Sequence, residues 1–381
     1  MTPGELMRSQ LNQKGWTQEE LAYIMGRSRK TVMDLMAGRT GITPETAVAL
    51  GKAFGNDPGE WMRLQTEYQL SLAKETIPDG IERRAKLYDL APISDMQRRG
   101  WISETRDPEE LERQLKCFFG KENLEEPIEL VPTALRGKHF TELNNSERAW
   151  CFRARQLAAS LVVPPFSPRK LDELEKKLRL LAAYPKEISR LPKLLSEYGI
   201  RFAVIEPIPG VKIDGATFWI DDKSPVIAIT LRCDRIDGFW FTLMHEIGHI
   251  RNGDALAVDR DLIDVLKGLN VVLEADENEA ERHANEYAGK SLISSHEMES
   301  FIGRVGPLYS REKVIQFAHR VKIHPGIIVG QLQYRREIGY ASLREMLVKV
   351  RHITISTALT DGWNQTVTPT IGGERVTATN R

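Results

Sequence analysis

The first 78 residues alternate short apolar clusters with signals that start and stop helices. Thr17-Gln18-Glu19-Glu20 is a capping box, in which a hydroxyl and a glutamate three residues later satisfy the first amides of a helix. Gly26 supplies a tight turn, Ser28 can cap a second helix, and Thr43-Pro44-Glu45 can open a third. The pattern predicts a helix, a turn and a helix with supporting helices on either side, ending at the break Ile77-Pro78-Asp79-Gly80.

The rest of the chain changes pattern twice. Residues 79–180 are mostly helical in periodicity but are interrupted by prolines, and they carry no recognisable chemistry. Between 199 and 232, three runs of β-branched and aromatic residues separated by Pro, Gly and Asp predict three short strands. Helical periodicity resumes in IDGFWFTLMHEIGHI and continues, with interruptions, to about His352. Residues 360–381 are rich in Thr and Gly, which predicts a mobile tail.

We therefore expect a mainly α fold with a small β-sheet (α+β), in a chain long enough for about two or three domains. No internal repeat is visible. The predicted parts are a helix-turn-helix bundle at 1–78, a helical connector at 79–180, a domain at 181–340 that holds the strands, and a C-terminal helix and flexible tail at 341–381.

Composition narrows the class of protein. Hydrophobic residues make up 41% and charged residues 28%, as in globular proteins. There is no apolar run long enough to span a bilayer or to act as a signal peptide, so we expect a cytoplasmic protein without a membrane partner. Cys117, Cys151 and Cys233 form no CxxC pair, which argues against a disulfide framework and against a four-thiolate zinc site. The net charge is zero, so any contact with DNA must be local.

A local basic cluster lies in the predicted helix-turn-helix. Residues 27–39 carry four basic side chains and one aspartate. At the start of the second helix, side chains would reach base edges in the major groove, while Ser28 and Arg39 would hold phosphates. The predicted DNA contacts are Arg27, Ser28, Arg29, Lys30, Thr31 and Arg39. The alternative is a small helical bundle that docks on another protein.

A family resemblance supports the DNA-binding interpretation. GWTQEELAYIMGRSRKTVMDLMAGRTGITPETAVALGKAFG resembles the XRE-type helix-turn-helix family. With the flanking PGELMRSQL and PGEWMRLQTEYQLSLA, it is similar to the branch that contains HigA-type antitoxins, over nearly all of residues 3–75. The resemblance implies binding to an operator in DNA, as a homodimer, and autoregulation of an operon.

The segment His245-Glu246-Ile247-Gly248-His249 has the HExxH pattern within a stretch of helical periodicity. Residues four apart share one helix face, so both imidazoles can direct a nitrogen at one Zn²⁺. Zinc lowers the pKa of a water to about 7. Glu246 would accept a proton from this water and deliver it to the leaving amine, which predicts peptide hydrolysis without a covalent intermediate. The alternative is a pair of core histidines with other hydrogen-bond partners.

A catalytic zinc needs a third protein ligand, and spacing alone leaves five candidates in the next helix: Glu277, Glu279, Glu281, His283 and Glu286. HEIGH followed by Glu281-x-x-Ala284-Asn285-x-Tyr287-Ala288 resembles the ImmA/IrrE metallopeptidase family, over about 180–335. In that family the glutamate three residues before Ala-Asn is the third ligand, which implies Glu281.

The sequence does not decide which residues orient the metal ligands. His283 is a candidate for supporting a ligand or stabilising an oxyanion, and Asp254 or Asp276 could orient a ligand imidazole. The strand GATFWID could be an edge to which a substrate segment adds, or an interior strand.

These observations predict a DNA-binding transcriptional regulator with a zinc-dependent endopeptidase domain. By resemblance, the substrate would be a partner regulatory protein in a toxin–antitoxin, mobile-element or stress-response operon. One alternative is a HigA-like antitoxin whose zinc domain binds a partner without proteolysis. Another is a broad degradative protease, which would gain nothing from an operator-binding module. Glu246 favours retained chemistry, because a protein that only binds could lose this base.

Overall fold

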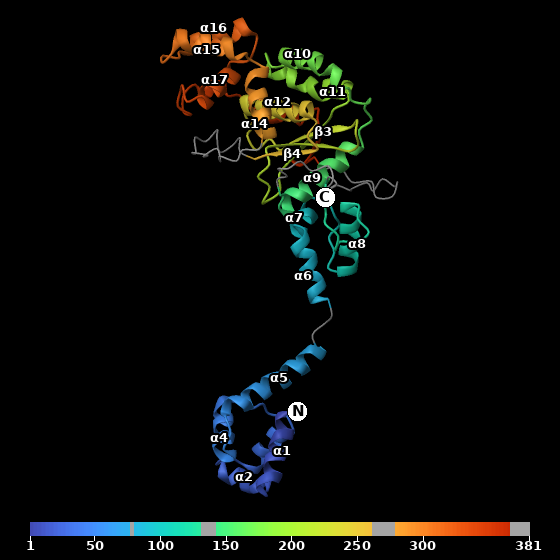
Figure 1. Ribbon diagram of the computed structural model, residues 1–381, viewed down its shortest axis with the longest axis vertical. Helices are drawn as coiled ribbons and strands as arrows, with labels where there is room; N and C mark the ends of the chain where they lie inside the picture. Colours follow the sequence, from blue (N-terminus) through green and yellow to red (C-terminus); the bar gives the residue numbers. More distant parts are fainter. Residues whose placement is uncertain (77–79, 131–141, 261–278, 366–381) are drawn as a thin grey trace. The chain divides into compact units, whose positions relative to one another are not determined.

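The computed structural model describes residues 1–76, 80–130, 142–260 and 279–365 (Figure 1). The chain forms two compact units, Met1–Glu82 and Arg83–Arg381. Helices predominate and one small sheet is present, so the predicted fold class is confirmed. In the parts of the chain that the structure describes, no helix is both long and apolar enough to cross a membrane.

The first unit consists of five helices, and its local signals act as predicted. The Thr17 hydroxyl accepts a hydrogen bond from the Glu20 amide at 3.2 Å, and the Glu20 carboxylate accepts one from the Thr17 amide at 2.7 Å. The fully buried side chains of Leu21, Val32 and Trp61 contribute to the core. The helices are α1 (Pro3–Lys14), α2 (Gln18–Ile24), α3 (Arg29–Met36), α4 (Pro44–Phe54) and α5 (Pro58–Thr76).

The second unit is built around a mixed five-stranded sheet with the order β4-β2-β3-β1-β5. Strand β1 runs parallel to β3 and β5, whereas β2 runs antiparallel to β3 and β4. The three predicted strands are β1, β2 and β3, and the sequence pattern missed β4 and β5. The strands are β1 (Arg201–Ile205), β2 (Gly215–Trp219), β3 (Pro225–Ile229), β4 (Leu256–Asp259) and β5 (Leu359–Asp361).

Helices cover both faces of this sheet (Figure 1). Their bounds are α6 (Ile81–Leu90), α7 (Ile93–Arg98), α8 (Pro108–Phe119), α9 (Asn145–Ala159), α10 (Leu171–Leu181), α11 (Leu191–Glu197), α12 (Ile236–Asn252), α14 (Glu279–Ser291), α15 (Ser295–Val305), α16 (Arg311–Val321), α17 (Pro325–Tyr334) and α18 (Arg351–Thr354). The described residues also form the short 3₁₀ helices η2 (Pro168–Lys170), η3 (Pro185–Arg190) and η4 (Arg344–Met346). The helical periodicity predicted to about His352 is therefore broken after α17.

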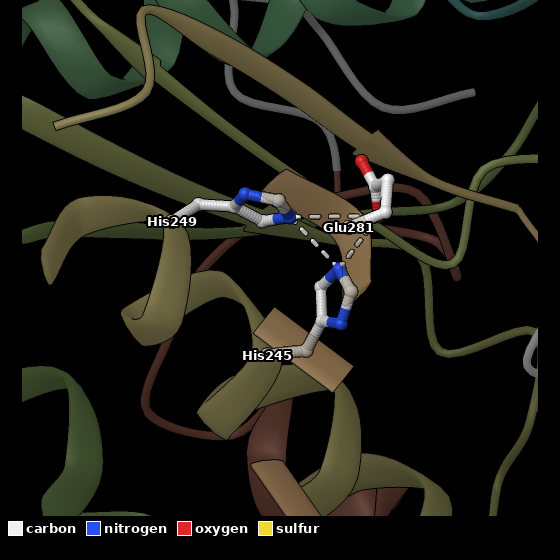
Figure 2. A group of neighbouring side chains, drawn as sticks. All are labelled: His245, His249 and Glu281. Carbon is white, nitrogen blue, oxygen red and sulfur yellow. Dashed lines mark hydrogen bonds and ion pairs between the residues drawn. The ribbon is translucent and has the colours of Figure 1, made fainter. Parts of the chain in front are cut away.

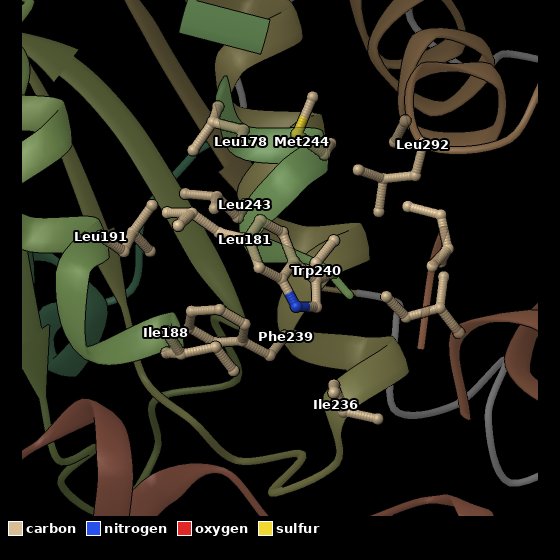
Figure 3. Packing of buried hydrophobic residues seen from close by; sticks show 14 of the residues in the cluster. Leu178, Leu181, Ile188, Leu191, Ile236, Phe239, Trp240, Leu243, Met244 and Leu292 are labelled. Atoms are coloured by element: carbon tan, nitrogen blue, oxygen red, sulfur yellow. The ribbon is translucent and has the colours of Figure 1, made fainter. Parts of the chain in front are cut away.

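Each side of the sheet packs against its own hydrophobic core, because successive side chains along a strand point to opposite sides. Phe202 and Val204 of β1 pack into the core that contains α12, whereas Ala203 and Ile205 pack into the core that contains α8 and α9. Figure 3 shows the first core, where Trp240 and the neighbouring apolar residues of α12 meet α10. Helix α12 is thereby held between the sheet and a second layer of helices.

The region predicted as a separate connector belongs to the second unit. Helix α9 lies against the sheet, and Trp150 Nε1 donates a hydrogen bond to the carbonyl of Ile205 in β1 at 3.3 Å. Glu147, at the start of α9, forms an ion pair with Arg260 at 2.7 Å. The proline interruptions in the sequence gave no sign of these contacts, because their partners lie more than fifty residues away.

The predicted mobile tail is wrong for its first residues. Leu359–Asp361 forms β5, and the fully buried Asp361 pairs with Arg153 at 2.5 Å and with Arg99 at 2.8 Å. A Thr- and Gly-rich composition hid this strand because it pairs with the distant β1, and Asp361 forms its ion pairs with Arg153 of α9 and with Arg99, which follows α7. Residues 366–381 of the predicted tail lie outside the described residues.

Candidate metal centre and nucleic-acid interface

Helix α12 places His245, Glu246 and His249 inside the second unit. All three side chains are buried, with exposed fractions of 1% or less. The apolar residues Leu243, Met244 and Ile247 between and beside them belong to the surrounding core. The HExxH residues therefore lie on a rigid helix, as the periodicity predicted.

Three side-chain atoms converge beside this helix (Figure 2). Nε2 of His245 lies 2.9 Å from Nε2 of His249. Oε2 of Glu281, on α14, lies 3.2 Å from the first nitrogen and 3.6 Å from the second. Helices α12 and α14 pack closely along their length, and Gly248 permits this approach because a Cβ there would lie 3.1 Å from the Ala284 backbone. The structure thus brings together the two histidines and the glutamate that the sequence selected.

The opposite nitrogens of the two imidazoles also have partners. Nδ1 of His245 lies 2.9 Å from Oδ1 of Asn285, and Nδ1 of His249 lies 2.7 Å from a carboxylate oxygen of Asp254. A carboxylate or amide oxygen only accepts, so each Nδ1 is the donor. Each Nε2 is therefore the nitrogen that can bind a metal ion at the point where the three side chains meet, once it has lost any proton that it carries.

Glu246 differs from the other carboxylates in the site. Its side chain is fully buried, and neither oxygen has a hydrogen-bond partner among the described residues. The Thr217 hydroxyl on β2 donates instead to the main-chain carbonyl of Glu246 at 3.1 Å. Gly215 leaves the space that this carboxylate fills, because a Cβ there would overlap Glu246 Oε1 and lie 2.6 Å from Thr242 Cγ2. The carboxylate is held beside the sheet and remains available for chemistry.

Burial and charge shift the pKa values of these groups in different directions. Burial raises the pKa of Glu246 to about 7. Burial opposes the charge of His249, but the carboxylates of Asp254 and Glu281 outweigh it and raise the pKa of this imidazole to about 10. The pKa of Glu281 is lowered to about 2, because contact with both imidazoles outweighs burial. Without a metal, the site therefore attracts protons to the nitrogens that face one another.

The donor set fits a divalent metal ion. Two imidazole nitrogens and one carboxylate oxygen are the ligands of catalytic zinc sites, which keep one position open. A cation, whether a proton or a metal ion, stabilises a buried point where two imidazoles and a carboxylate face each other. These are the donor types that Zn²⁺ binds.

The other candidate ligands lie elsewhere. The side chain of His283 is 51% exposed and lies 4.0 Å from the Glu279 carboxylate, away from the point where the three side chains meet. Glu279 is itself exposed, and Glu286 pairs with Lys290 on the surface. Asp276 and Glu277 lie outside the described residues.

Sequence reasoning left the supporting partners undecided. Of the two aspartates considered for orienting an imidazole, the structure selects Asp254. Asn285 was overlooked as a partner of His245, although it stands in the Ala-Asn pair of the pattern that pointed to Glu281. The Ala-Asn pair was therefore the feature of the sequence that could have pointed to this partner. Strand β2 (GATFW) lies inside the sheet, so the proposal that it is an edge is wrong, and β4 is the edge strand beside the site.

In the first unit, helix α3 buries Val32, Leu35 and Met36 and presents its opposite face to solvent. Ser28 caps this helix, and its hydroxyl accepts from the Thr31 amide at 3.1 Å and lies 2.8 Å from the Thr31 hydroxyl. The six residues predicted to contact DNA lie at the start of α3 and in the turns on either side of it, all exposed except the half-buried Thr31: Arg27, Ser28, Arg29, Lys30, Thr31 and Arg39.

Two of these basic side chains already have acidic partners. Arg29 pairs with Glu19 of α2 at 2.6 Å, and Arg39 pairs with Asp34 at 2.7 Å. Exposed ion pairs contribute only about 0–1 kcal/mol, so DNA phosphates can compete for both arginines. The individual contacts to DNA stay predictions.

Comparison with known proteins identifies the first unit. A helix-turn-helix family model matches residues 7–61. Virulence-associated protein A' of Dichelobacter nodosus is 35% identical over 80 residues, which cover 21% of this chain and 70% of that protein. The chain belongs to the helix-turn-helix family. Virulence-associated protein I of the same organism is 32% identical over 74 residues, or 19% of this chain and 68% of that protein.

A third relative carries a functional name. The uncharacterized HTH-type transcriptional regulator YddM of Escherichia coli (strain K12) is 29% identical over 75 residues, which cover 20% of this chain and 80% of that protein. The predicted XRE-type helix-turn-helix and its DNA-binding class are confirmed by these matches. Each of the three similarities covers about one fifth of the chain.

Proposed function

We propose that this protein is a transcriptional regulator whose second unit is a zinc-dependent endopeptidase of the ImmA/IrrE type. The proposal rests on the convergence of His245 Nε2, His249 Nε2 and Glu281 Oε2 beside the buried carboxylate of Glu246, which has no hydrogen-bond partner among the described residues. A purely structural histidine pair has no use for an unpartnered buried carboxylate, which costs free energy. A hydrolytic site needs a base in this position.

His245, His249 and Glu281 would hold the zinc ion, and Asp254 and Asn285 would fix the two imidazoles in the ligating tautomer. Bound zinc supplies Lewis-acid chemistry, which polarises a carbonyl group and acidifies water. The ligands themselves transfer no proton in this scheme. The ligands contribute by fixing the position of the zinc ion relative to the Glu246 carboxylate.

Glu246 is the proton carrier. A carboxyl group with a pKa near 7 can both accept and release a proton at neutral pH, because neither form is strongly favoured. Its oxygen takes a proton from the attacking water and delivers it to the nitrogen of the scissile peptide bond. Gly215 and Thr217 of β2 define the place of this residue, one by leaving space and the other by holding the main-chain carbonyl.

The first unit supports a regulatory setting for this chemistry. Its relatives include a protein named as a transcriptional regulator, and its α3 presents basic residues to solvent. We infer that it binds an operator as a homodimer through the residues at the start of α3. The substrate would be a partner regulatory protein in a toxin–antitoxin, mobile-element or stress-response operon, since a nonspecific protease has no need for operator binding.

The test compares the wild type with Glu246→Gln and His249→Ala. Wild type and Glu246→Gln should each retain about one zinc per chain by elemental analysis, whereas His249→Ala should retain much less. Only the wild type should cleave the product of a neighbouring gene when the two are co-expressed. If Glu246→Gln regulates as the wild type does and no neighbouring product is cleaved, the second unit is a binding module of a HigA-like antitoxin.

A further inference from the structure

Asp259, the last residue of the edge strand β4, faces the metal centre. It pairs with Gly215 of β2 in the antiparallel ladder, and residues directly opposite one another project from the same face of a sheet. The face at Gly215 is known, because a Cβ there would overlap the Glu246 carboxylate of α12. The side chain of Asp259 therefore projects toward α12.

The distances agree with this orientation. A carboxylate oxygen of Asp259, a carboxylate oxygen of Glu246 and a ring nitrogen of His245 all lie within 4.8 Å of one another. Asp259 is 8% exposed, and Glu246 is fully buried with no hydrogen-bond partner for either oxygen among the described residues. Two carboxylates this close and this buried repel each other, so this side of the centre attracts a further positively charged or donating group.

The carboxylate of Asp259 lies beside Glu246, the proposed base, rather than in the group formed by the three proposed metal ligands. Glu281 completes the group that contains both imidazoles, whereas Asp259 groups with His245 and Glu246. Glu246 is the residue that would deliver a proton to the leaving nitrogen. A side chain next to Glu246, such as that of Asp259, therefore lies close to the position of the leaving nitrogen.

We propose that Asp259 is a further catalytic residue, which accepts hydrogen bonds from the nitrogen of the scissile peptide bond as this nitrogen becomes an amine. This inference rests on the proposed peptidase function. In the reaction, the water oxygen bonds to the carbonyl carbon and the C–N bond breaks with its electron pair left on nitrogen. Both water protons end on that nitrogen, and Glu246 carries the first. The nitrogen thus changes from a neutral amide with one N–H into an ammonium group with three.

An aspartate suits this change because its carboxylate only accepts hydrogen bonds when ionised and binds a cation more strongly than a neutral amide. The contact strengthens as the bond breaks, so it should act on the chemical step rather than on initial binding. Asp259 would therefore bind the new amino terminus of the C-terminal cleavage product.

The kinetic test uses zinc-loaded full-length protein and, as substrate, the purified product of the neighbouring gene with its amines dimethylated, and new amines are measured by fluorescamine. Asp259→Ala should lower kcat about 10- to 100-fold with little change in KM, as expected for a lost hydrogen bond to a charged group. Asp259→Asn keeps an accepting oxygen and should lose less. Zinc content should equal that of the wild type in both variants, and Asp222→Ala, an exposed site, should leave kcat unchanged.

A second measurement separates amine binding from a structural role. The probes are a mixture of Xaa-Leu-amide dipeptides with free amino termini and the same mixture after N-acetylation, used as inhibitors. The wild type should be inhibited more strongly by the free amines, and Asp259→Ala should lose this preference. Equal inhibition of the wild type by both mixtures overturns the inference, as does an Asp259→Ala kcat within twofold of the wild type; either result leaves the peptidase in place. Absence of any Glu246-dependent cleavage overturns both proposals.

Discussion

The carboxylate of Asp254 lies 2.7 Å from Nδ1 of His249, although Asp254 comes after the end of the helix that carries the histidine. The turn at Gly253, whose φ is 76°, reverses the chain, and the Asp254 amide donates to the His249 carbonyl at 3.0 Å. Glycine adopts this left-handed conformation without the cost that a Cβ brings. The end of α12 thus delivers the carboxylate that orients its own metal ligand.

Removal of this support should weaken zinc binding. Asp254→Ala and Asn285→Ala each leave one imidazole without its Nδ1 partner, and we expect the affinity for Zn²⁺ to fall about 10- to 100-fold in each. Competition with a chromogenic chelator measures the affinity. Asp222→Ala, on an exposed position, is the control. Unchanged affinity in both variants would show that the two contacts do not tune the site.

Gly215 should be essential for cleavage but not for metal binding. Gly215→Ala puts a methyl group where Glu246 Oε1 and Thr242 lie, so the carboxylate must move while His245, His249 and Glu281 remain. We expect cleavage to fall at least tenfold with zinc content retained, because displacement of a catalytic group by about an ångström is costly. Gly289→Ala on α14 is the matched control, since a Cβ there meets nothing within 4 Å. Full cleavage by Gly215→Ala would contradict the placement of Glu246.

Zinc binding should release protons at neutral pH. In the metal-free site the pKa of His249 is raised to about 10, so this imidazole is charged at pH 7, and zinc binds only the neutral form. The apparent affinity should therefore increase as the pH rises from 6 to 8. Calorimetry in buffers of different ionisation enthalpy should give a release of about one proton per zinc. A binding enthalpy that is independent of the buffer would count against this charge state.

The sequence predicted features that depend on the spacing of residues within one helix. It missed those that depend on contacts between segments far apart in the chain. His245 and His249 could be placed on one face because a helix brings residues four apart together. The edge strand β4 has only four residues and shows no alternation long enough to detect, so Asp259 went unnoticed. The link between Arg153 and Asp361 spans 208 residues, and nothing in either segment indicates the other.

The buried ion pair at β5 should be important for stability. Asp361 is fully buried and bonds both Arg153 and Arg99, so Asp361→Ala removes a carboxylate from the buried Arg153 guanidinium, whereas Arg99 keeps Glu206 at 3.6 Å. We expect the free energy of unfolding of the second unit to fall by about 3–5 kcal/mol. Chemical denaturation followed by circular dichroism measures the change. Asp222→Ala should be neutral, and a loss below about 1 kcal/mol in Asp361→Ala would argue against β5 as part of the sheet.

The DNA contacts can be tested on the chain's own promoter. Arg29→Ala and Lys30→Ala together should weaken specific binding by at least about 1–3 kcal/mol in a gel shift, because both side chains extend from the start of α3. Arg63→Ala, an exposed arginine on α5 of the same unit, is the control and should bind as the wild type does. Full-affinity specific binding by the double variant would remove these residues from the interface.

If the second unit is a peptidase, it cuts a protein by means of Glu246. The most direct measurement is a comparison of new protein amino termini, by mass spectrometry, in cells that express the wild type or Glu246→Gln at equal levels. We expect at least one new terminus inside a regulatory protein in wild-type cells, with the same protein uncut in Glu246→Gln cells. Identical sets of termini, from two proteins that both hold zinc, would contradict it.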